Sequence, residues 1–200
     1  MAKLIINLAN DVAHLVNNDP AMKDRLKVVF VPNYNVSVAE KLIPATDISQ
    51  HISTAGTEAS GTGNMKFILN GALILGTMDG ANIEIAEEVG AENFFTFGLS
   101  SDEINSLAES GYNPRVSYQN NPELREVLSM INTGYFNRDK PHLYNDLYNS
   151  LVFEDKYMLL EDFASYVECQ QRVMKTWADT EKWTKMSILN TAASGKFSSD

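Results

Sequence analysis

The chain has 200 residues, of which 44% are hydrophobic and 21% charged, and this balance is typical of a globular protein with its own core. Its 26 acidic residues outnumber its 16 basic residues, and the net charge of −10 argues against a nucleic-acid partner and against binding to anionic lipid. Cys169 is the only cysteine and no apolar run could span a membrane, so the sequence predicts a soluble, cytoplasmic protein without an intrachain disulfide.

The first elements of the chain alternate between helix and strand. Apolar residues at helical spacing predict an amphipathic helix over residues 4–16, which the polar run 17–20 ends. The continuous apolar run 27–31 predicts a strand buried on both faces of a parallel sheet. Ser37 is expected to cap a short helix over residues 38–43. Because an α/β chain rarely opens on a helix, we expect further sequence upstream in the natural protein.

A glycine-rich segment follows the next predicted strand, residues 47–54. It contains Gly56, Gly61 and Gly63 and leads into a helix predicted over residues 62–70. Glycines allow backbone N–H groups to approach a ligand, and a helix N-terminus attracts anions. The segment therefore predicts a phosphate site, with Lys66 beside it as a charge or as an amine that captures a carbonyl group.

Two well-known glycine motifs do not fit this segment. Thr62 and Gly63 stand where a nucleotide P-loop needs lysine and serine or threonine, and Lys66 stands where the dinucleotide motif needs its third glycine. The pattern alone is equally compatible with a flexible turn between a strand and a helix.

Further strands are predicted over residues 72–77 and 93–97, with a turn at Asp79-Gly80 and a helix over 82–89 between them. The alternation predicts an α/β fold with an open, mostly parallel sheet. Ligands bind such sheets outside the carboxyl ends of the strands. Tyr34 and the glycine segment both follow predicted strand ends, and this position favours a binding site over a simple turn.

The second half of the chain, residues 101–200, has only helical patterns. Ser100 and Glu103 form a capping box, and Asn121-Pro122 opens a helix that Gly134 closes. Aliphatic and aromatic stripes predict three more helices around residues 143–151, 163–177 and 183–189. The three histidines lie far apart without further ligands at suitable spacing, so we expect no metal site.

Several motifs closely resemble the α-glucan phosphorylases, the family of glycogen, starch and maltodextrin phosphorylases. The resemblance is carried by Tyr34 and by the segments 36–41, 52–66, 70–73, 76–82, 93–95, 97–98, 183–184 and 195–200, so it spans nearly the whole chain. It implies the Rossmann-like C-terminal lobe of a GT-B glycosyltransferase. Residues 1–200 would form a single, partial cofactor-binding domain, with the α/β part carrying the site in 1–100 and the mostly helical part in 101–200.

The resemblance also implies the site residues. Lys66 matches the lysine that forms the Schiff base with pyridoxal 5'-phosphate. The backbone at Gly61, Thr62 and Gly63 would hold the cofactor phosphate, and Tyr34 would contact the cofactor. The substrate-binding positions, which face the glucosyl unit, would be Glu58, Ala59, Ser60 and Gly61.

The implied reaction is phosphorolysis of an α-1,4-glucan by inorganic phosphate, which gives glucose 1-phosphate with retention of configuration. The full-length protein is expected to be a homodimer, and the isolated chain is expected to be inactive because half of the family's active site is absent from it. Two alternatives stay open: a nucleotide-sugar or dinucleotide-binding lobe without pyridoxal phosphate, and a segment that serves only as a folding or interaction unit.

Overall fold

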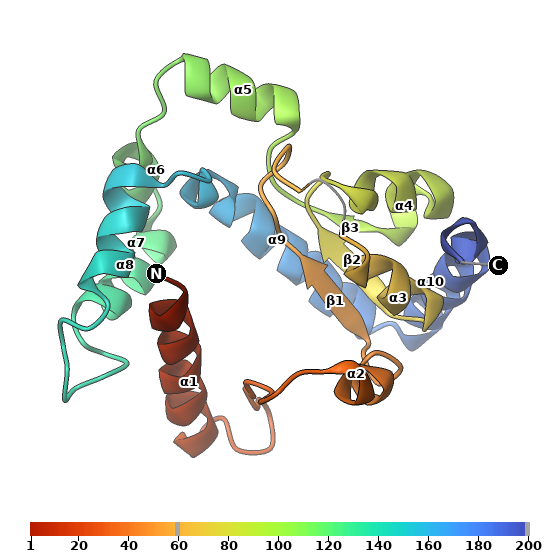
Figure 1. Ribbon diagram of the computed structural model, residues 1–200, viewed down its shortest axis with the longest axis horizontal. Coiled ribbons are helices and arrows are strands. Elements are labelled where there is room, and N and C mark those ends of the chain that lie inside the picture. Colours follow the sequence, from red (N-terminus) through yellow and green to blue (C-terminus); the bar gives the residue numbers. More distant parts are fainter. Residues whose placement is uncertain (59–60, 199–200) are drawn as a thin grey trace. The chain divides into compact units, whose positions relative to one another are not determined.

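The computed structural model describes residues 1–58 and 61–198. The chain forms two compact units, each made of two stretches of sequence. Unit 1 comprises Met1–Tyr34 and Asn113–Lys156, and unit 2 comprises Asn35–Tyr112 and Tyr157–Asp200. Figure 1 shows the elements of both units, coloured along the chain.

Unit 2 is built on a small parallel sheet with the strand order β1-β2-β3. The strands are β1 (Ile48–His51), β2 (Leu73–Gly76) and β3 (Phe95–Thr96). Ile48 is in register with Leu73, and Leu75 with Phe95. The predicted α/β fold with a parallel sheet is therefore confirmed, although each strand is shorter than its apolar pattern suggested.

Helices cover both faces of this sheet, because successive side chains of β2 point to opposite sides. Leu73 and Leu75 pack in one buried cluster with Cys169 of α9 (Leu159–Trp177) and Trp183 of α10 (Thr180–Ala193). Ile74 packs in a second cluster on the other face, with Ile68, Ile85 and Phe94. All four residues of β2 are buried, which is the burial expected for the central strand of a three-layer arrangement.

The helices beside the sheet begin and end near their predicted positions. Unit 2 also contains α2 (Val36–Leu42), α3 (Gly63–Leu69), α4 (Ala81–Val89), η1 (Ala91–Asn93), α5 (Ser101–Glu109) and η3 (Ser194–Phe197). The capping box of Ser100 and Glu103 is present at the start of α5. The predicted cap of α2 was wrong: the side chain of Asn35, not of Ser37, accepts a hydrogen bond from the Val38 N–H at 3.1 Å. Asparagine is an equally good N-cap, so the helix begins two residues earlier.

Unit 1 is helical throughout its regular structure. It contains α1 (Ala2–Asn18), α6 (Pro114–Asn120), α7 (Pro122–Asn132), α8 (Asn145–Asn149) and the π-helix η2 (Ser150–Glu154). Helix α6 has a cap that the sequence analysis overlooked: Asn113 accepts from the Arg115 N–H, and Pro114 follows at the first helical position. All regular elements described after residue 100 are helices, as predicted.

The predicted strand at residues 27–31 is wrong. This segment has no regular structure, and the side chains of Val29 and Phe30 are 62% and 48% exposed. In place of a strand partner, the side-chain amide of Asn17 donates to the Val28 carbonyl at 2.7 Å and accepts from the Val28 N–H at 2.9 Å. A strand needs a neighbouring ladder, and no described strand pairs with this run.

Across the described ranges 1–58 and 61–198, the structure contains no helix with the length and apolar character needed to cross a membrane.

Candidate functional site

A cavity of about 270 Å³ lies in unit 2 where the predicted site should be. It opens at the carboxyl ends of β1 and β2 and at the first residues of α3 and α4. The lining residues are Gln50, His51, Ile52, Ser53, Glu58, Gly61, Asn64, Asp79, Ala81 and Asn82. The site follows the rule that parallel sheets bind ligands beyond the carboxyl ends of their strands.

The buried carboxylate of Asp79 holds the glycine segment in place. Its Oδ1 accepts from the Gly56 N–H at 2.8 Å, and its Oδ2 accepts from the Glu58 N–H at 2.8 Å and from the Ser53 hydroxyl at 2.9 Å. Asp79 is only 4% exposed, so these three donors take the place of water around the charge. Hydrogen bonds to an ionised group are the stronger kind, and they fix the backbone on both sides of Thr57.

Two buried asparagines join the starts of α3 and α4. The Asn64 side chain donates to Asn82 Oδ1 at 2.8 Å, and Asn82 Nδ2 donates in turn to the Thr77 carbonyl at 2.9 Å. Gly76 makes this packing possible, because a Cβ there would lie 2.5 Å from Asn82 Nδ2 and 2.7 Å from the His51 carbonyl oxygen. The two helices are thereby set side by side at the floor of the cavity.

Glu58 and Gly61 come together at the rim of this cavity. A Cβ on Gly61 would lie 3.7 Å from the Glu58 carboxyl carbon. Gly80 presses on the same side chain: it has φ +51, and a Cβ there would lie 2.9 Å from Glu58 Cγ. The carboxylate of Glu58 is exposed and has no hydrogen-bonding partner among the described residues, so its oxygens can accept from the hydroxyls of a ligand.

His51 lines the same cavity as Glu58. Burial lowers the pKa of the His51 imidazole, and the negative charge of Glu58 opposes that shift. The ring lies 3.0 Å from the Ser49 hydroxyl through Nε2, and a Cβ on Gly63 would lie 3.3 Å from Cε1. A glycine at position 63 therefore lets α3 start directly against the imidazole.

Lys66 lies on α3, one turn beyond Gly63, and its side chain is exposed. Its ammonium makes no ion pair or hydrogen bond within the described part of the chain. Thr62 is the N-cap of α3 but makes no capping bond through its side chain. The Met65 N–H donates to Asn64 Oδ1 at 2.9 Å, so the N–H groups of Gly63 and Asn64 are the ones left without a side-chain acceptor among the residues that the structure describes. The start of α3, which could bind an anion, and the amine of Lys66 thus lie one turn apart.

The structure brings some of the predicted site residues together at one cavity of unit 2. Glu58 and Gly61 line the cavity. Thr62 is the N-cap of the following helix α3, and Gly63 and Lys66 belong to that helix. Tyr34 belongs to unit 1 and is 62% exposed. The predicted substrate positions Ala59 and Ser60 lie outside the described residues. Of the three glycines in the segment only Gly56 has a positive φ, at +85.

The sequence analysis missed Asp79, Asn64 and Asn82 as members of the site. Asp79 was interpreted only as part of a turn, because its partners lie 21 to 26 residues earlier in the chain. No local pattern reports such a distant bond. The described residues also contain no group of three or more histidine, cysteine, aspartate or glutamate side chains placed to hold a metal ion.

Residues 1–200 match the family described as carbohydrate phosphorylase over their whole length. The chain belongs to the carbohydrate phosphorylase family. It is 52% identical over 200 residues to the muscle form of glycogen phosphorylase from Homo sapiens, and 54% identical over 199 residues to the glycogen phosphorylase of Synechocystis. The brain form from Homo sapiens is 52% identical over 200 residues.

Each of these matches covers all of this chain but only part of the relative. The chain spans 24% of the length of both human phosphorylases and 23% of the Synechocystis protein.

Proposed function

We propose that this chain is the cofactor-bearing part of an α-1,4-glucan phosphorylase, a glycosyltransferase that uses inorganic phosphate to release glucose 1-phosphate from the glucan with retention. The observation that carries the proposal is the placement of Lys66 one turn beyond a glycine-flanked helix start, where the N–H groups of Gly63 and Asn64 have no side-chain acceptor among the described residues. The family match over residues 1–200 and the identity to glycogen phosphorylases support it.

The residues present fit pyridoxal 5'-phosphate. The N–H groups at Gly61, Thr62 and Gly63 would hold its phosphate, because a helix start offers unpaired donors and the positive end of the helix dipole. Lys66 would carry the cofactor through its amine, and Tyr34 would contact it. Bound cofactor supplies a phosphate group that can hold and release a proton beside the substrate phosphate.

The other residues of the cavity have supporting tasks. Glu58 would accept hydrogen bonds from hydroxyls of the glucosyl unit, with Ala59, Ser60 and Gly61 along the same wall. Asp79 would act indirectly: it accepts a hydrogen bond from the Glu58 N–H, which holds in place the backbone that carries the Glu58 carboxylate. A negative charge at Glu58 would also keep phosphate away from the sugar side of the site.

The wider setting belongs to the same proposal. Residues 1–200 would form one Rossmann-like C-terminal lobe of a GT-B enzyme that works in the cytoplasm as a homodimer. By itself the chain would not catalyse phosphorolysis, since it spans about a quarter of the length of its relatives.

The first experiment tests the cofactor assignment directly. The 200-residue chain is incubated with pyridoxal 5'-phosphate, treated with borohydride to fix any lysine-bound cofactor, digested and analysed by mass spectrometry. We expect the adduct on Lys66, its loss in Lys66→Arg, and its retention in the control Lys41→Arg, which removes an exposed lysine from α2 of the same unit.

Lys66→Ala in the full-length enzyme should abolish release of glucose 1-phosphate from maltodextrin and phosphate. An adduct confined to other lysines, or unchanged turnover in full-length Lys66→Ala, would reject the assignment. Saturable binding of a nucleotide-sugar at the Glu58 cavity without any adduct would instead favour the lobe without pyridoxal phosphate.

A further inference from the structure

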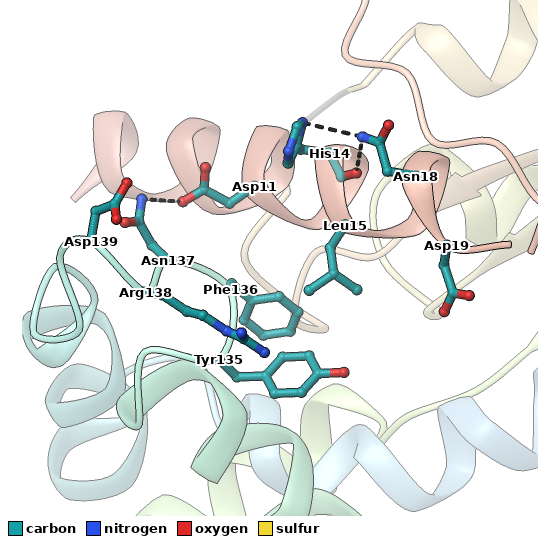
Figure 2. A pocket seen from close by; sticks show the side chains of 10 residues that line it. All are labelled: Asp11, His14, Leu15, Asn18, Asp19, Tyr135, Phe136, Asn137, Arg138 and Asp139. Carbon is teal, nitrogen blue, oxygen red and sulfur yellow. Dashed lines mark hydrogen bonds between the residues drawn. The ribbon is translucent and has the colours of Figure 1, made fainter.

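Unit 1 contains a second and larger cavity, with a volume of about 630 Å³. It lies between α1 and the loop of residues 135–139 that follows α7, as Figure 2 shows. Its volume falls within the range of pockets that bind small organic ligands. None of the residues assigned to the phosphorylase site lines it.

The loop of this cavity is fastened to α1 by Asp11. The carboxylate of Asp11 accepts a hydrogen bond from Asn137 Nδ2 at 2.8 Å and a second one from the hydroxyl of Tyr144, which is only 1% exposed. The other end of the Asn137 amide accepts from the Lys140 N–H at 3.0 Å. Both walls of the cavity are therefore held in place before any ligand arrives, which lowers the entropic cost of binding.

The walls combine aromatic faces with unused polar groups. The rings of Tyr135 and Phe136 meet edge to face with centroids 5.3 Å apart, and Tyr135 is 47% exposed. In Figure 2 Leu15 extends from α1 toward these rings, and the guanidinium of Arg138 lies on the loop beside them. Neither Arg138 nor Asp139 has a hydrogen-bonding or ionic partner among the described residues, so both can serve a ligand.

The charge around the cavity restricts the class of ligand. Three carboxylates, those of Asp11, Asp19 and Asp139, line it together with one guanidinium. Anions such as phosphate esters would be repelled by this excess of negative charge. Carboxylate acceptors and a guanidinium donor beside an exposed aromatic ring suit a neutral molecule that has many hydroxyl groups and one apolar face.

We propose that this cavity is a carbohydrate-binding site, separate from the Lys66 site, that takes a short neutral oligosaccharide. The ring of Tyr135 stacks on the C–H face of one sugar residue, because the electron-rich face of an aromatic ring attracts the slightly positive C–H groups. Oδ1 of Asp19 accepts from the Ala21 N–H at 2.8 Å, which leaves its Oδ2 for a ligand. Asp139 and Oδ2 of Asp19 accept hydrogen bonds from sugar hydroxyls, and Arg138 donates to sugar oxygens. The site would hold a glucan on unit 1 without taking part in bond cleavage.

Titration calorimetry with maltotriose, applied to the 200-residue chain, tests this proposal. We expect saturable binding of one maltotriose, and Tyr135→Ala should weaken it about tenfold, since aromatic stacking of this kind contributes about one power of ten in affinity. Arg138→Gln provides a second test at an exposed position, where folding is not at risk. Phe153→Ala is the matched control, because it removes an exposed aromatic ring of unit 1 that lies outside the cavity.

The adduct experiment separates this site from the proposed phosphorylase site. Tyr135→Ala and Arg138→Gln should leave the pyridoxal phosphate adduct on Lys66 unchanged, and maltotriose binding at this cavity does not depend on that adduct, so failure of the cofactor assignment would not affect this result. The carbohydrate proposal is overturned if maltotriose shows no saturable binding, if binding persists in both Tyr135→Ala and Arg138→Gln, or if Glu58→Gln alone removes it. Displacement of maltotriose by inorganic phosphate or by putrescine at equal concentration would also overturn it, in favour of a charged ligand.

Discussion

Two apolar runs of this chain have similar composition but different structures. Residues 72–77 contain the central strand β2, which pairs with β1 on one side and β3 on the other and is buried on both faces. Residues 27–31 have no regular structure and expose Val29 and Phe30. Both runs carry the pattern of a doubly buried strand.

The difference lies in the partners that each run meets. Around β2, helices α3 and α4 supply one apolar cover and α9 and α10 the other. Around residues 27–31 no described strand supplies a ladder, and the hydrogen bonds of this run come from the side-chain amide of Asn17. An apolar run thus indicates that a segment can be buried, whereas its actual burial depends on neighbouring segments elsewhere in the chain.

The largest loss of stability should come from shortening a buried side chain on the central strand β2. Leu75 is fully buried among Phe95, Cys169 and Trp183, so Leu75→Ala leaves a cavity and should lower the free energy of unfolding by about 3 kcal/mol. Leu189→Ala on α10 is the control, because Leu189 is 41% exposed and should cost much less. Urea unfolding followed by circular dichroism measures both, and equal losses would show that β2 is not the centre of the core.

The sequence predicted the elements whose signals are local. The capping box at Ser100, the helix opening at Asn121-Pro122 and the alternation of short apolar runs with helices all report on neighbours within a few residues, and the structure contains them. The failures have a common cause. The run 27–31 lacks a ladder, and the choice between Asn35 and Ser37 as a cap depends on which side chain reaches an N–H group.

The same limit applies to the candidate site. Glycine spacing predicted a site before a helix start, the family resemblance named Glu58 and Gly61 within it, and both line one cavity in the structure. The anchoring by Asp79 and the pairing of Asn64 with Asn82 join residues at least 18 positions apart. A single sequence carries no periodicity for such bonds, so only the folded chain reveals them.

The glycine segment lies between the two apolar runs in this respect: it has no strand partner, but the buried side chain of Asp79 holds its backbone. Asp79→Asn would turn an amide N–H₂ toward one of three donors, those of Gly56, Glu58 and Ser53. We expect a loss of about 2 kcal/mol in the free energy of unfolding, because a charged acceptor is lost and a buried donor is left unpaired. Hydrogen exchange at the Gly56 and Glu58 amides should accelerate.

The control for Asp79 is Glu168→Gln, an isosteric change at an exposed carboxylate of α9. It should leave both the stability and the exchange rates unchanged. If Asp79→Asn behaved like this control, the carboxylate would not be what fixes the glycine segment.

A smaller loss of stability is expected at Asn17, whose exposed side-chain amide makes hydrogen bonds to Val28 in a segment that has no strand partner. Asn17→Ala removes the two hydrogen bonds to Val28 and should cost about 1 kcal/mol, the usual net contribution of such bonds. Asn10→Ala is the control on the same helix, since Asn10 bonds only to the Ile6 carbonyl one turn away. Faster exchange of the Val28 amide in Asn17→Ala alone would confirm the contact, and equal rates in both variants would contradict it.

The smallest effect should come from the exposed run itself. Val29→Ser should change the free energy of unfolding by less than about 0.5 kcal/mol, because its side chain already lies mostly in water. Val152→Ser makes the same chemical change at a buried position of unit 1 and should cost about 2 kcal/mol, since it removes apolar contacts and buries a hydroxyl. Equal costs at the two positions would mean that residues 27–31 are packed against a partner after all, and the contrast between the two apolar runs would then disappear.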